Sequence, residues 1–516
     1  MITMQNMAPL MFAGLVVVML IGFPVAFSLA ALGLFAGFIS IELGFFPAQY
    51  LANLPLRIFG ILSNDLLLAI PFFTFMGAIL ERCGLAEDLL EGTGQLFGSV
   101  PGGLAYAVII VGAILGAITG TVAASVIAMG MISLPIMLKY GYNMRLGTGV
   151  IAAAGTITQV IPPSLVLVVL ADQLGKSVGD MYKGAIGPSI AQTLIFIVYI
   201  FAVSIFKPHW MPPLPPEART MRGWDLWKKV LWGMVPSIVL IFLVLGTIFM
   251  GLATPTEAGA MGAVGAMGLA AMNKRLTWPL VRQGMESTAR ITAMVIFILL
   301  GSTVFSLVFQ GVDGAIWIEH MLVSMTGGTV VGFLVVVNLF VFFLAFFLDF
   351  FEIAFIIIPL LAPVAAKLGI DLIWFGVLLC VNMQTSFMHP PFGFALFYLR
   401  GIAPKEVKSS DIYLGAIPWV ILQLILVAVL IFWPGMVTMW LDKEVAVDLD
   451  KVKIEVQSVD DEPKPGADDP AAKDGAAKGA SAESGKSDPA KPAEEEDLGK
   501  VLQKQIEDEA KKAGGK

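Results

Sequence analysis

The stretches GTITQVIPPS (155–164) and NMQTSFMHPPFG (382–393) decide the fold of this chain. Each lies inside an apolar segment long enough to cross a membrane, and each contains two consecutive prolines. Proline lacks a backbone N–H and disfavours helix in the residue before it, so a double proline breaks the helix. Two spanning helices, each broken at a double proline, indicate an internal repeat.

The spacing of other residues supports this repeat. From Gly141 to Pro162 the interval is 21 residues, and from Gly369 to Pro390 it is the same. A Gly-Gly pair begins each unit, at 102–103 and at 327–328. The ordered set of matches predicts two structurally equivalent halves.

The composition describes a membrane protein. Of 516 residues, 57% are hydrophobic and 14% are charged, whereas soluble domains carry about 25% charged residues. Residues 441–516 hold 20 of the 39 acidic and 13 of the 32 basic residues, which leaves 19 of each sign in the first 440. A neutral, charge-poor body excludes a nucleic-acid partner. It predicts an all-α polytopic membrane protein.

Segments of about 20 apolar residues are expected to span the bilayer. We expect them near 8–40, 64–82, 144–172, 184–206, 228–250, 253–272, 288–311, 371–400 and 411–436. Two longer stretches, 102–138 and 328–367, are interrupted by GAITGT (116–121) and DFFE (349–352). Because a charge at mid-membrane costs several kcal/mol, we expect both stretches to be re-entrant hairpins.

These assignments divide the chain into five parts. They are an N-terminal membrane helix and interfacial arm (1–62), a first repeat (63–206), a basic loop with connecting scaffold helices (207–287), a second repeat (288–440) and a disordered charged tail (441–516). The amphipathic segments 43–62 and 84–100 are expected along the membrane surface. An odd number of crossings separates the repeats, and the basic loops 207–229, 273–290 and 400–408 fall on one side. The repeats are therefore expected to be inverted, as in elevator-type secondary transporters.

The helix breaks are the predicted site. A broken helix frees backbone carbonyls for a cation and offers a helix N-terminus to an anion. Oxygen-bearing side chains and small residues precede each break and suit sodium, a hard cation. The expected site combines these residues, the prolines that line it and the hairpin tips: Gly155, Thr156, Gln384, Thr385, Ser386, Pro162, Pro163, Pro390, Pro391, Gly120, Thr121, Ser125 and Asp349.

Structural alternatives stand beside these assignments. Each double proline could be a packing kink, although two at equivalent positions favour a site. The Thr121 hydroxyl could bond back to its own helix, and Asp349 could cap the second helix of its hairpin. His389, directly before the second break, is better explained as a satisfied interfacial histidine than as a proton site.

The residues also carry a resemblance. GLATPTEAGAMGAVGA (251–266), GTITQVIPPS, FFLDFFEIAFIIIPLLAP (346–363) and PPFGFALFYLRGIAP (390–404) resemble the DctM-type large membrane subunit of tripartite ATP-independent periplasmic (TRAP) transporters, over about residues 1–436. The resemblance implies a bacterial inner-membrane permease driven by a sodium gradient. Its implied partners are a small four-helix membrane subunit, a periplasmic substrate-binding protein and a small carboxylate substrate.

The same resemblance implies two sodium sites. The first would involve Thr121, Gly155 and Thr156, and the second Gln384, Thr385, Ser386 and the turn before Pro390. Family members usually have Ser where Thr121 stands and a small residue or Thr where His389 stands. The charged tail is not part of the family pattern.

Secondary active uptake of a small organic acid is therefore the expected function, with sodium as the coupling ion and no other cofactor or metal. The alternative within transport is a stand-alone sodium or proton symporter of organic anions, and a purely structural subunit is a third reading. The chain has no HExxH, catalytic triad or GxxxxGK[ST] pattern, so neither an enzyme nor an ATP-driven pump is expected.

Overall fold

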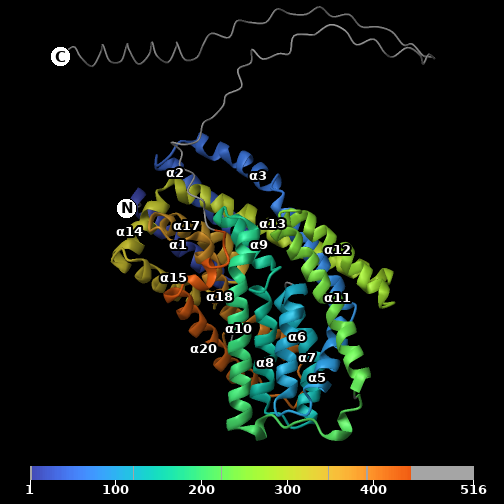
Figure 1. Cartoon of the computed structure of the whole chain (residues 1–516). Helices are drawn as coiled ribbons and strands as arrows, with labels where there is room; N and C mark the ends of the chain where they lie inside the picture. Colours follow the sequence, from blue (N-terminus) through green and yellow to red (C-terminus); the bar gives the residue numbers. More distant parts are fainter. Residues whose placement is uncertain (1–2, 120, 222, 347, 391–392, 443–516) are drawn as a thin grey trace, which may run out of the picture. The chain divides into compact units, whose positions relative to one another are not determined.

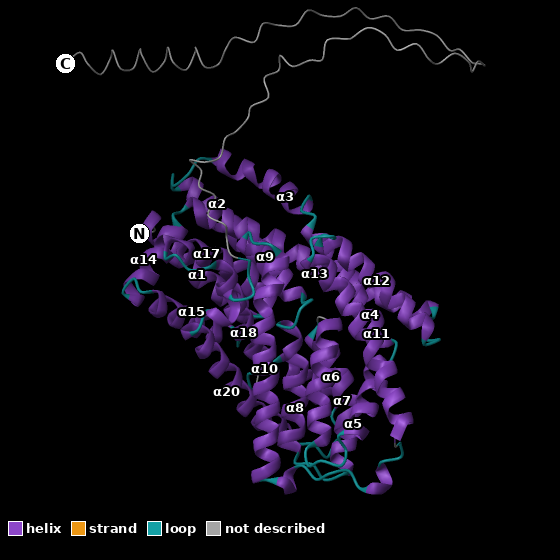
Figure 2. Ribbon diagram, viewed as in Figure 1, coloured by secondary structure: helices purple, strands orange, loops and turns teal. Residues whose placement is uncertain are grey.

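The computed structural model describes residues 3–442 except 120, 222, 347 and 391–392, and this part consists of helices and connecting loops without strands (Figure 2). Seven of its helices are long and apolar enough to span a bilayer, and two bent helix pairs pass the same test. The chain is an all-α polytopic membrane protein, as predicted. The predicted sites Gly120 and Pro391, and residues 443–516 of the tail, lie outside the described residues.

The first repeat runs from a spanning helix through a hairpin to a broken helix (Figure 1). Its elements are α4 (Leu66–Arg82), α5 (Leu85–Leu96), α6 (Gly103–Thr119), α7 (Val122–Lys139), α8 (Met144–Thr156), η2 (Ile157–Gln159), α9 (Leu165–Leu174) and α10 (Val178–Phe206).

The second repeat follows the same order. Its elements are α13 (Trp278–Gly311), α14 (Gly314–Thr326), α15 (Val330–Leu344), α16 (Phe350–Glu352), the π-helical η5 (Ile353–Ile357), α17 (Ile358–Lys367), α18 (Leu372–Met383), η6 (Gln384–Met388), α19 (Phe394–Ile402) and α20 (Ser409–Phe432). Both hairpins and both broken helices therefore occur where the sequence predicts them.

The remaining elements precede, connect or follow the repeats. They are α1 (Met4–Ile21), α2 (Val25–Glu42), η1 (Ala48–Asn53), α3 (Leu54–Leu62), η3 (Pro208–Trp210), η4 (Pro216–Ala218), α11 (Gly223–Phe249), α12 (Pro255–Met272) and α21 (Gly435–Thr438). The TPTE sequence starts α12 as a capping box, in which the Thr254 hydroxyl accepts the Glu257 N–H and the Glu257 carboxylate accepts the Thr254 N–H.

The two repeats exchange partners. The helix α4 packs against α12 and its counterpart α13 packs against α2, two helices that lie outside the repeats. In the same way α8 packs against α20 while α18 packs against α10, and α7 packs against α19 while α9 packs against α17. Reciprocal pairing of this kind is what a twofold relation between two repeats produces. Each broken helix thus packs against elements of both halves.

The contact between α8 and α20 is especially close. A β-carbon on Gly149 of α8 would collide with the Gly415 carbonyl and the Trp419 indole of α20. A β-carbon on Gly415 would collide with the Arg145 carbonyl of α8. Glycine at both positions lets the two helix backbones touch, which is the use of small residues in membrane helix packing.

Two expectations need correction. The apolar stretch 8–40, which we expected to form one membrane helix, is two helices, because the chain turns at Gly22, with φ +88°, and Pro24 precedes α2. The predicted surface segment 84–100 contains α5, whose apolar face is buried against α6 and α11. On its charged side, Glu91 pairs with Lys229 at 2.5 Å. Protein, rather than lipid, covers the apolar face of α5.

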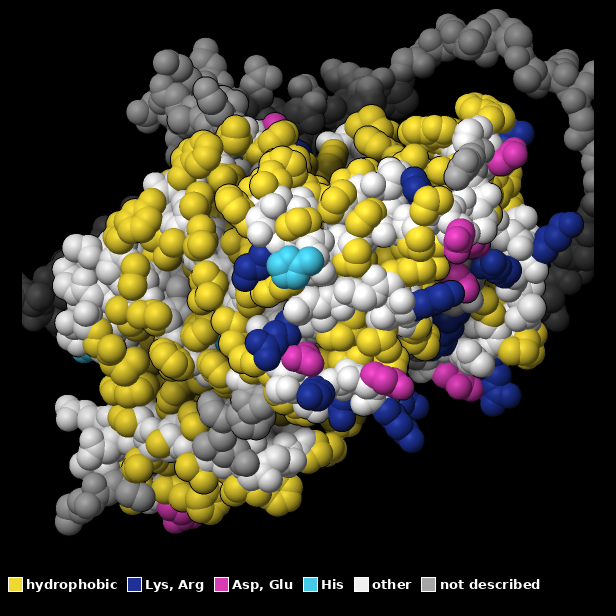
Figure 3. All heavy atoms as spheres, turned by 90° about the horizontal axis from the view of Figure 1, so that it is seen from below, with side chains coloured by type: hydrophobic (Ala, Val, Ile, Leu, Met, Phe, Trp, Pro, Cys, Tyr) yellow, Lys and Arg dark blue, Asp and Glu magenta, His cyan; other side chains and the backbone are white. Residues whose placement is uncertain are grey.

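Charged side chains gather on part of the surface. Seen from below, Lys, Arg, Asp and Glu side chains cluster on one part of the face, beside a broad hydrophobic part (Figure 3). The lower ends of α10 and α11 lie at this end of the molecule (Figure 1), and the loop between them contains Lys207 and Arg219. We expect this end to face the cytoplasm, since basic loops remain on that side.

Labelling of introduced cysteines tests whether the hairpins are re-entrant. Cysteines at Val100 and Lys139, at the two ends of the first hairpin, are expected to react from the same side of the membrane. Those at Val330 and Lys367 should both react from the opposite side. All four positions are exposed, and the native Cys83 and Cys380 are buried and form a silent background.

Gly103 cannot serve as a labelling position, because a β-carbon there would collide with the Phe97 carbonyl. Reaction of the two ends of either hairpin from opposite sides would show that this hairpin crosses the membrane.

Candidate functional site

The two helix breaks meet in the interior of the protein. The Thr156 hydroxyl at the end of α8 lies 3.3 Å from the Met388 sulfur in the second break. The Cys380 thiol of α18 lies 3.5 Å from the Gln159 carbonyl in the first break. Residues more than 220 positions apart in the sequence are thus direct neighbours, and the two breaks meet.

In the first break, a serine reconnects the two halves of the helix. Pro162 and Pro163 separate η2 from α9. The Ser164 hydroxyl donates to the Gln159 carbonyl at 2.5 Å and accepts the Val166 N–H at 3.2 Å. One hydroxyl therefore satisfies a carbonyl from the first half and caps the second half, as a helix N-cap does.

In the second break, η6 continues α18 to Met388 and then ends. The hydroxyls of Thr385 and Ser386 donate back to the carbonyls of Asn382 and Met383, at 2.7 and 2.5 Å. The Gly393 N–H donates to the His389 carbonyl at 2.7 Å and closes the turn before α19. Both hydroxyl oxygens keep lone pairs for a further partner.

The first hairpin lies directly against the first break. Gly116 of α6 packs so closely on η2 that a β-carbon there would lie 2.9 Å from the Thr158 Cα. Gly155 at the end of α8 faces α7, where a β-carbon would collide with Val126. The hairpin and the break can approach this closely because glycine stands at both positions.

The predicted residues of the first hairpin tip are placed as follows. Thr121 precedes α7 with an extended backbone, and its hydroxyl makes no capping hydrogen bond to that helix. The alternative that this hydroxyl bonds back to its own helix is therefore not what the structure shows. Ser125 is buried one turn further along α7.

Asp349 in the second hairpin is a helix cap. Its carboxylate accepts the Glu352 N–H at 3.0 Å, and the Glu352 carboxylate accepts the Asp349 N–H at 3.0 Å. Both residues border an open pocket of about 510 Å³ beside α2 and α13. The alternative that Asp349 caps a helix is therefore what the structure shows, and the residue borders a pocket lined also by residues of α2 and α13.

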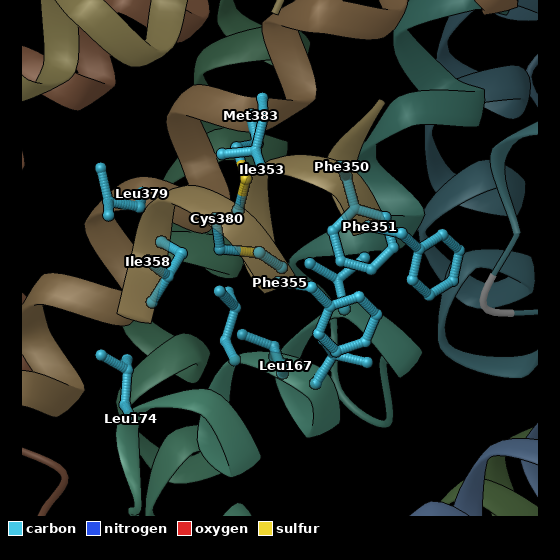
Figure 4. Packing of buried hydrophobic residues seen from close by; sticks show 14 of the residues in the cluster. Leu167, Leu174, Phe350, Phe351, Ile353, Phe355, Ile358, Leu379, Cys380 and Met383 are labelled. Atoms are coloured by element: carbon cyan, nitrogen blue, oxygen red, sulfur yellow. The ribbon is translucent and has the colours of Figure 1, made fainter. Parts of the chain in front are cut away.

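The second limb of this hairpin packs on the other repeat. Figure 4 shows Phe355 near Leu167 of α9, and Ile353 near Met383 of α18. Phe355 and Leu167 are fully or nearly fully buried. This apolar contact fixes the second hairpin to the half-helix that follows the first break.

His389 occupies a position that the sequence did not indicate. Its ring stacks on Phe346 at 4.2 Å between centroids and meets Phe342 edge-on at 4.3 Å. The ring is 2% exposed, and neither nitrogen has a hydrogen-bond partner among the described residues. The expectation of a satisfied interfacial histidine is therefore wrong: His389 is buried between two aromatic rings of the hairpin.

Three buried carboxamides from outside the two break sequences were not predicted: Gln192, Asn338 and Gln423. Gln192 of α10 donates to Gln384 at 2.5 Å, and Gln423 of α20 donates to the Thr156 hydroxyl at 3.4 Å. The third, Asn338 of α15, accepts at its backbone carbonyl the amide of Asn382, which belongs to the predicted stretch, at 2.8 Å. A lone polar residue in an apolar helix is the signal that could have revealed them.

The chemistry of this interior is polar but uncharged. Within residues 3–442 as described, every fully buried polar side chain belongs to an uncharged type, namely Ser, Thr, Asn, Gln, Tyr or His. No group of three His, Cys, Asp or Glu side chains in the same residues could hold a transition metal. Neutral oxygen atoms suit a hard monovalent cation, and they do not repel an anion bound beside it as carboxylates would. Together with the broken spanning helices, they define a multi-pass membrane transport protein.

Comparison with known proteins gives the family. The model of the DctM component of tripartite ATP-independent periplasmic transporters matches residues 12–436. The chain belongs to this family: it is the large permease of a TRAP transporter, a multi-pass protein of the bacterial inner membrane, and not an enzyme.

Individual relatives agree with this family assignment. The C4-dicarboxylate TRAP transporter large permease protein DctM of Pseudomonas aeruginosa is 29% identical over 76% of this chain and 89% of its own length. The protein of the same name from Rhodobacter capsulatus is 29% identical over 83% of this chain and 97% of its own length. The crystal structure of the Alcanivorax borkumensis YdaH transporter shares the fold, with a TM-score of 0.52 and 15% identity over 74% of this chain and 87% of that one.

Proposed function

We propose that this permease performs sodium-coupled uptake of a small organic acid. A periplasmic binding protein delivers the acid to the permease, which works together with a small four-helix membrane subunit. One observation carries the proposal: two helix breaks meet in an interior where the buried polar side chains of the described residues are all neutral. A cation bound there would find oxygen ligands but no carboxylate to neutralise it. A carboxylate substrate bound nearby would supply the missing negative charge, so that binding of each favours binding of the other.

The predicted ligands fit this chemistry. The hydroxyls of Thr156, Thr385 and Ser386 are buried at the breaks and have lone pairs left after their hydrogen bonds. The carboxamide oxygens of Gln159 and Asn382 are buried without a partner among the described residues. Oxygen atoms of this kind are the ligands that hard cations prefer. Organic acids are proposed as substrates because C4-dicarboxylates appear in the names of the relatives.

Uptake into proteoliposomes tests the proposal. The permease is reconstituted with a small membrane subunit and a periplasmic binding protein from the same organism, and radiolabelled C4-dicarboxylates and small monocarboxylates are offered. Uptake is expected when an inward sodium gradient is imposed, and it should collapse when choline replaces sodium. Addition of ATP should make no difference.

Two results would contradict parts of the proposal. Uptake at an undiminished rate without sodium would rule out sodium coupling. Equal uptake by the permease alone, without the other two proteins, would favour the stand-alone symporter.

A further inference from the structure

Gln192 and Gln423 occupy equivalent positions in the two repeats. Each lies on the helix that follows a broken helix, α10 or α20, and each stands eight residues after a glycine, Gly184 or Gly415. Those glycines mark the contact of α10 with α18 and of α20 with α8. Both glutamines are almost completely buried, at 1% and 0% exposure.

Each glutamine reaches the break of the opposite repeat. The Gln192 amide of the first repeat donates to the Gln384 carboxamide oxygen at 2.5 Å, in the second break. The Gln423 amide of the second repeat donates to the Thr156 hydroxyl at 3.4 Å, in the first break. The two acceptors are themselves equivalent, since Thr156 precedes Pro162 by six residues and Gln384 precedes Pro390 by six. The structure thus repeats one contact twice.

Each contact leaves an oxygen atom free. The carboxamide oxygens of Gln192 and Gln423 are buried and have no hydrogen-bond partner among the described residues. A polar atom buried in this way is unfavourable unless something binds to it. Each free oxygen is in the same carboxamide as the amide that contacts the break, so it lies beside the predicted ligands. Carboxamide oxygen is a ligand that hard cations accept.

We infer that Gln192 and Gln423 are sodium ligands, each of which completes the cation site at the helix break of the other repeat. The inference rests on the proposed function and adds to it two ligands from outside the broken helices. The inference also explains why α10 packs against α18 and α20 packs against α8: neither repeat contains a complete cation site by itself. Loss of Gln192, from the first repeat, should therefore impair the cation site at the second break. Loss of Gln423, from the second repeat, should impair the site at the first break.

Methionine and glutamate replacements separate a ligand from a structural donor. Methionine has a similar length and shape to glutamine but offers no oxygen, and glutamate keeps an oxygen but loses the amide donor. For Gln423→Met we expect the sodium concentration for half-maximal uptake to rise by about tenfold or more. For Gln423→Glu we expect it to stay within about threefold of the parent value or to fall. The same pattern is expected for Gln192→Met and Gln192→Glu.

Matched controls lie on the same helices. Leu426→Met, at a buried position one turn from Gln423, and Ile200→Met, at a buried position on α10, should leave the sodium dependence unchanged. A second measurement needs no partner protein: the thermal transition of the purified permease in detergent, with NaCl or choline chloride. Sodium should stabilise the parent, the controls and the glutamate variants more than the methionine variants.

The outcomes separate the inference from the function on which it rests. Methionine variants that behave as the controls, or methionine and glutamate variants that shift equally, would overturn the inference while sodium coupling stands. A parent protein whose uptake and thermal transition both ignore sodium would overturn the proposed function, and the inference with it.

Discussion

Uptake by the Thr156→Val variant is expected to need about ten to a hundred times more sodium than uptake by the parent protein. Valine keeps the shape of threonine but removes the hydroxyl oxygen, which is fully buried beside Gln423 and Met388. The Thr385→Val variant should show the same effect at the second break. Loss of a buried polar partner costs on the order of 1–3 kcal/mol, which gives the stated range.

The measurement is the sodium dependence of uptake in proteoliposomes at matched amounts of permease. Thr93→Val is the control, because Thr93 of α5 is also buried and also donates back to its own helix, at 2.7 Å to the Leu89 carbonyl, but it is not near a break. Substrate binding by the separate periplasmic protein should not change in any variant. Parent-like sodium dependence in both break variants would mean that the breaks are packing kinks.

Replacement of Gly149 by leucine is expected to remove nearly all folded protein. The side chain would have to occupy the space of the Gly415 carbonyl and the Trp419 ring, so α8 and α20 would have to separate. Overpacking of a buried contact typically costs 1–3 kcal/mol, and separation of two helix backbones also loses the contacts along both. Since α8 leads into the first break, the site would be lost with the contact.

The control for this prediction is Gly268→Leu. Gly268 is also inside a helix, α12, and a β-carbon there meets no atom within 4 Å. Both variants are extracted in detergent, and the monodisperse fraction is measured by size-exclusion chromatography. A normal yield of Gly149→Leu would show that α8 and α20 do not need to touch.

The features that sequence alone predicted are those that depend on local chemistry. The double prolines end the helical runs that begin with α8 and α18, whatever those helices pack against. The equal spacing in the two repeats placed both breaks and both hairpins correctly. The Asp349 cap was also within reach, as Asp followed three residues later by Glu is a capping pattern. The break between α1 and α2 was hidden because apolar residues flank Gly22 and Pro24 on both sides.

The features that sequence did not predict depend on which helices become neighbours. The contact between Thr156 and Gln423 joins residues 267 positions apart, and nothing near either one indicates the other. His389 was unpredictable for the same reason, because its environment consists of Phe342 and Phe346 on the opposing hairpin. A residue's own segment indicates whether it is buried, whereas its partner depends on the packing of the whole domain.

The neutral interior at the breaks has a consequence for the response of this protein to membrane voltage. Voltage acts on charge that moves across the bilayer, by about 2.3 kcal/mol per elementary charge per 100 mV. The two break segments, 155–164 and 382–393, contain no Asp, Glu, Lys or Arg, so the empty breaks carry no formal charge of their own. In the proposed cycle, the loaded site has a net positive charge when the number of bound sodium ions exceeds the number of negative charges on the substrate. The inside-negative potential then drives the inward step of the loaded site. When the breaks return empty, their own residues move no formal charge across the bilayer.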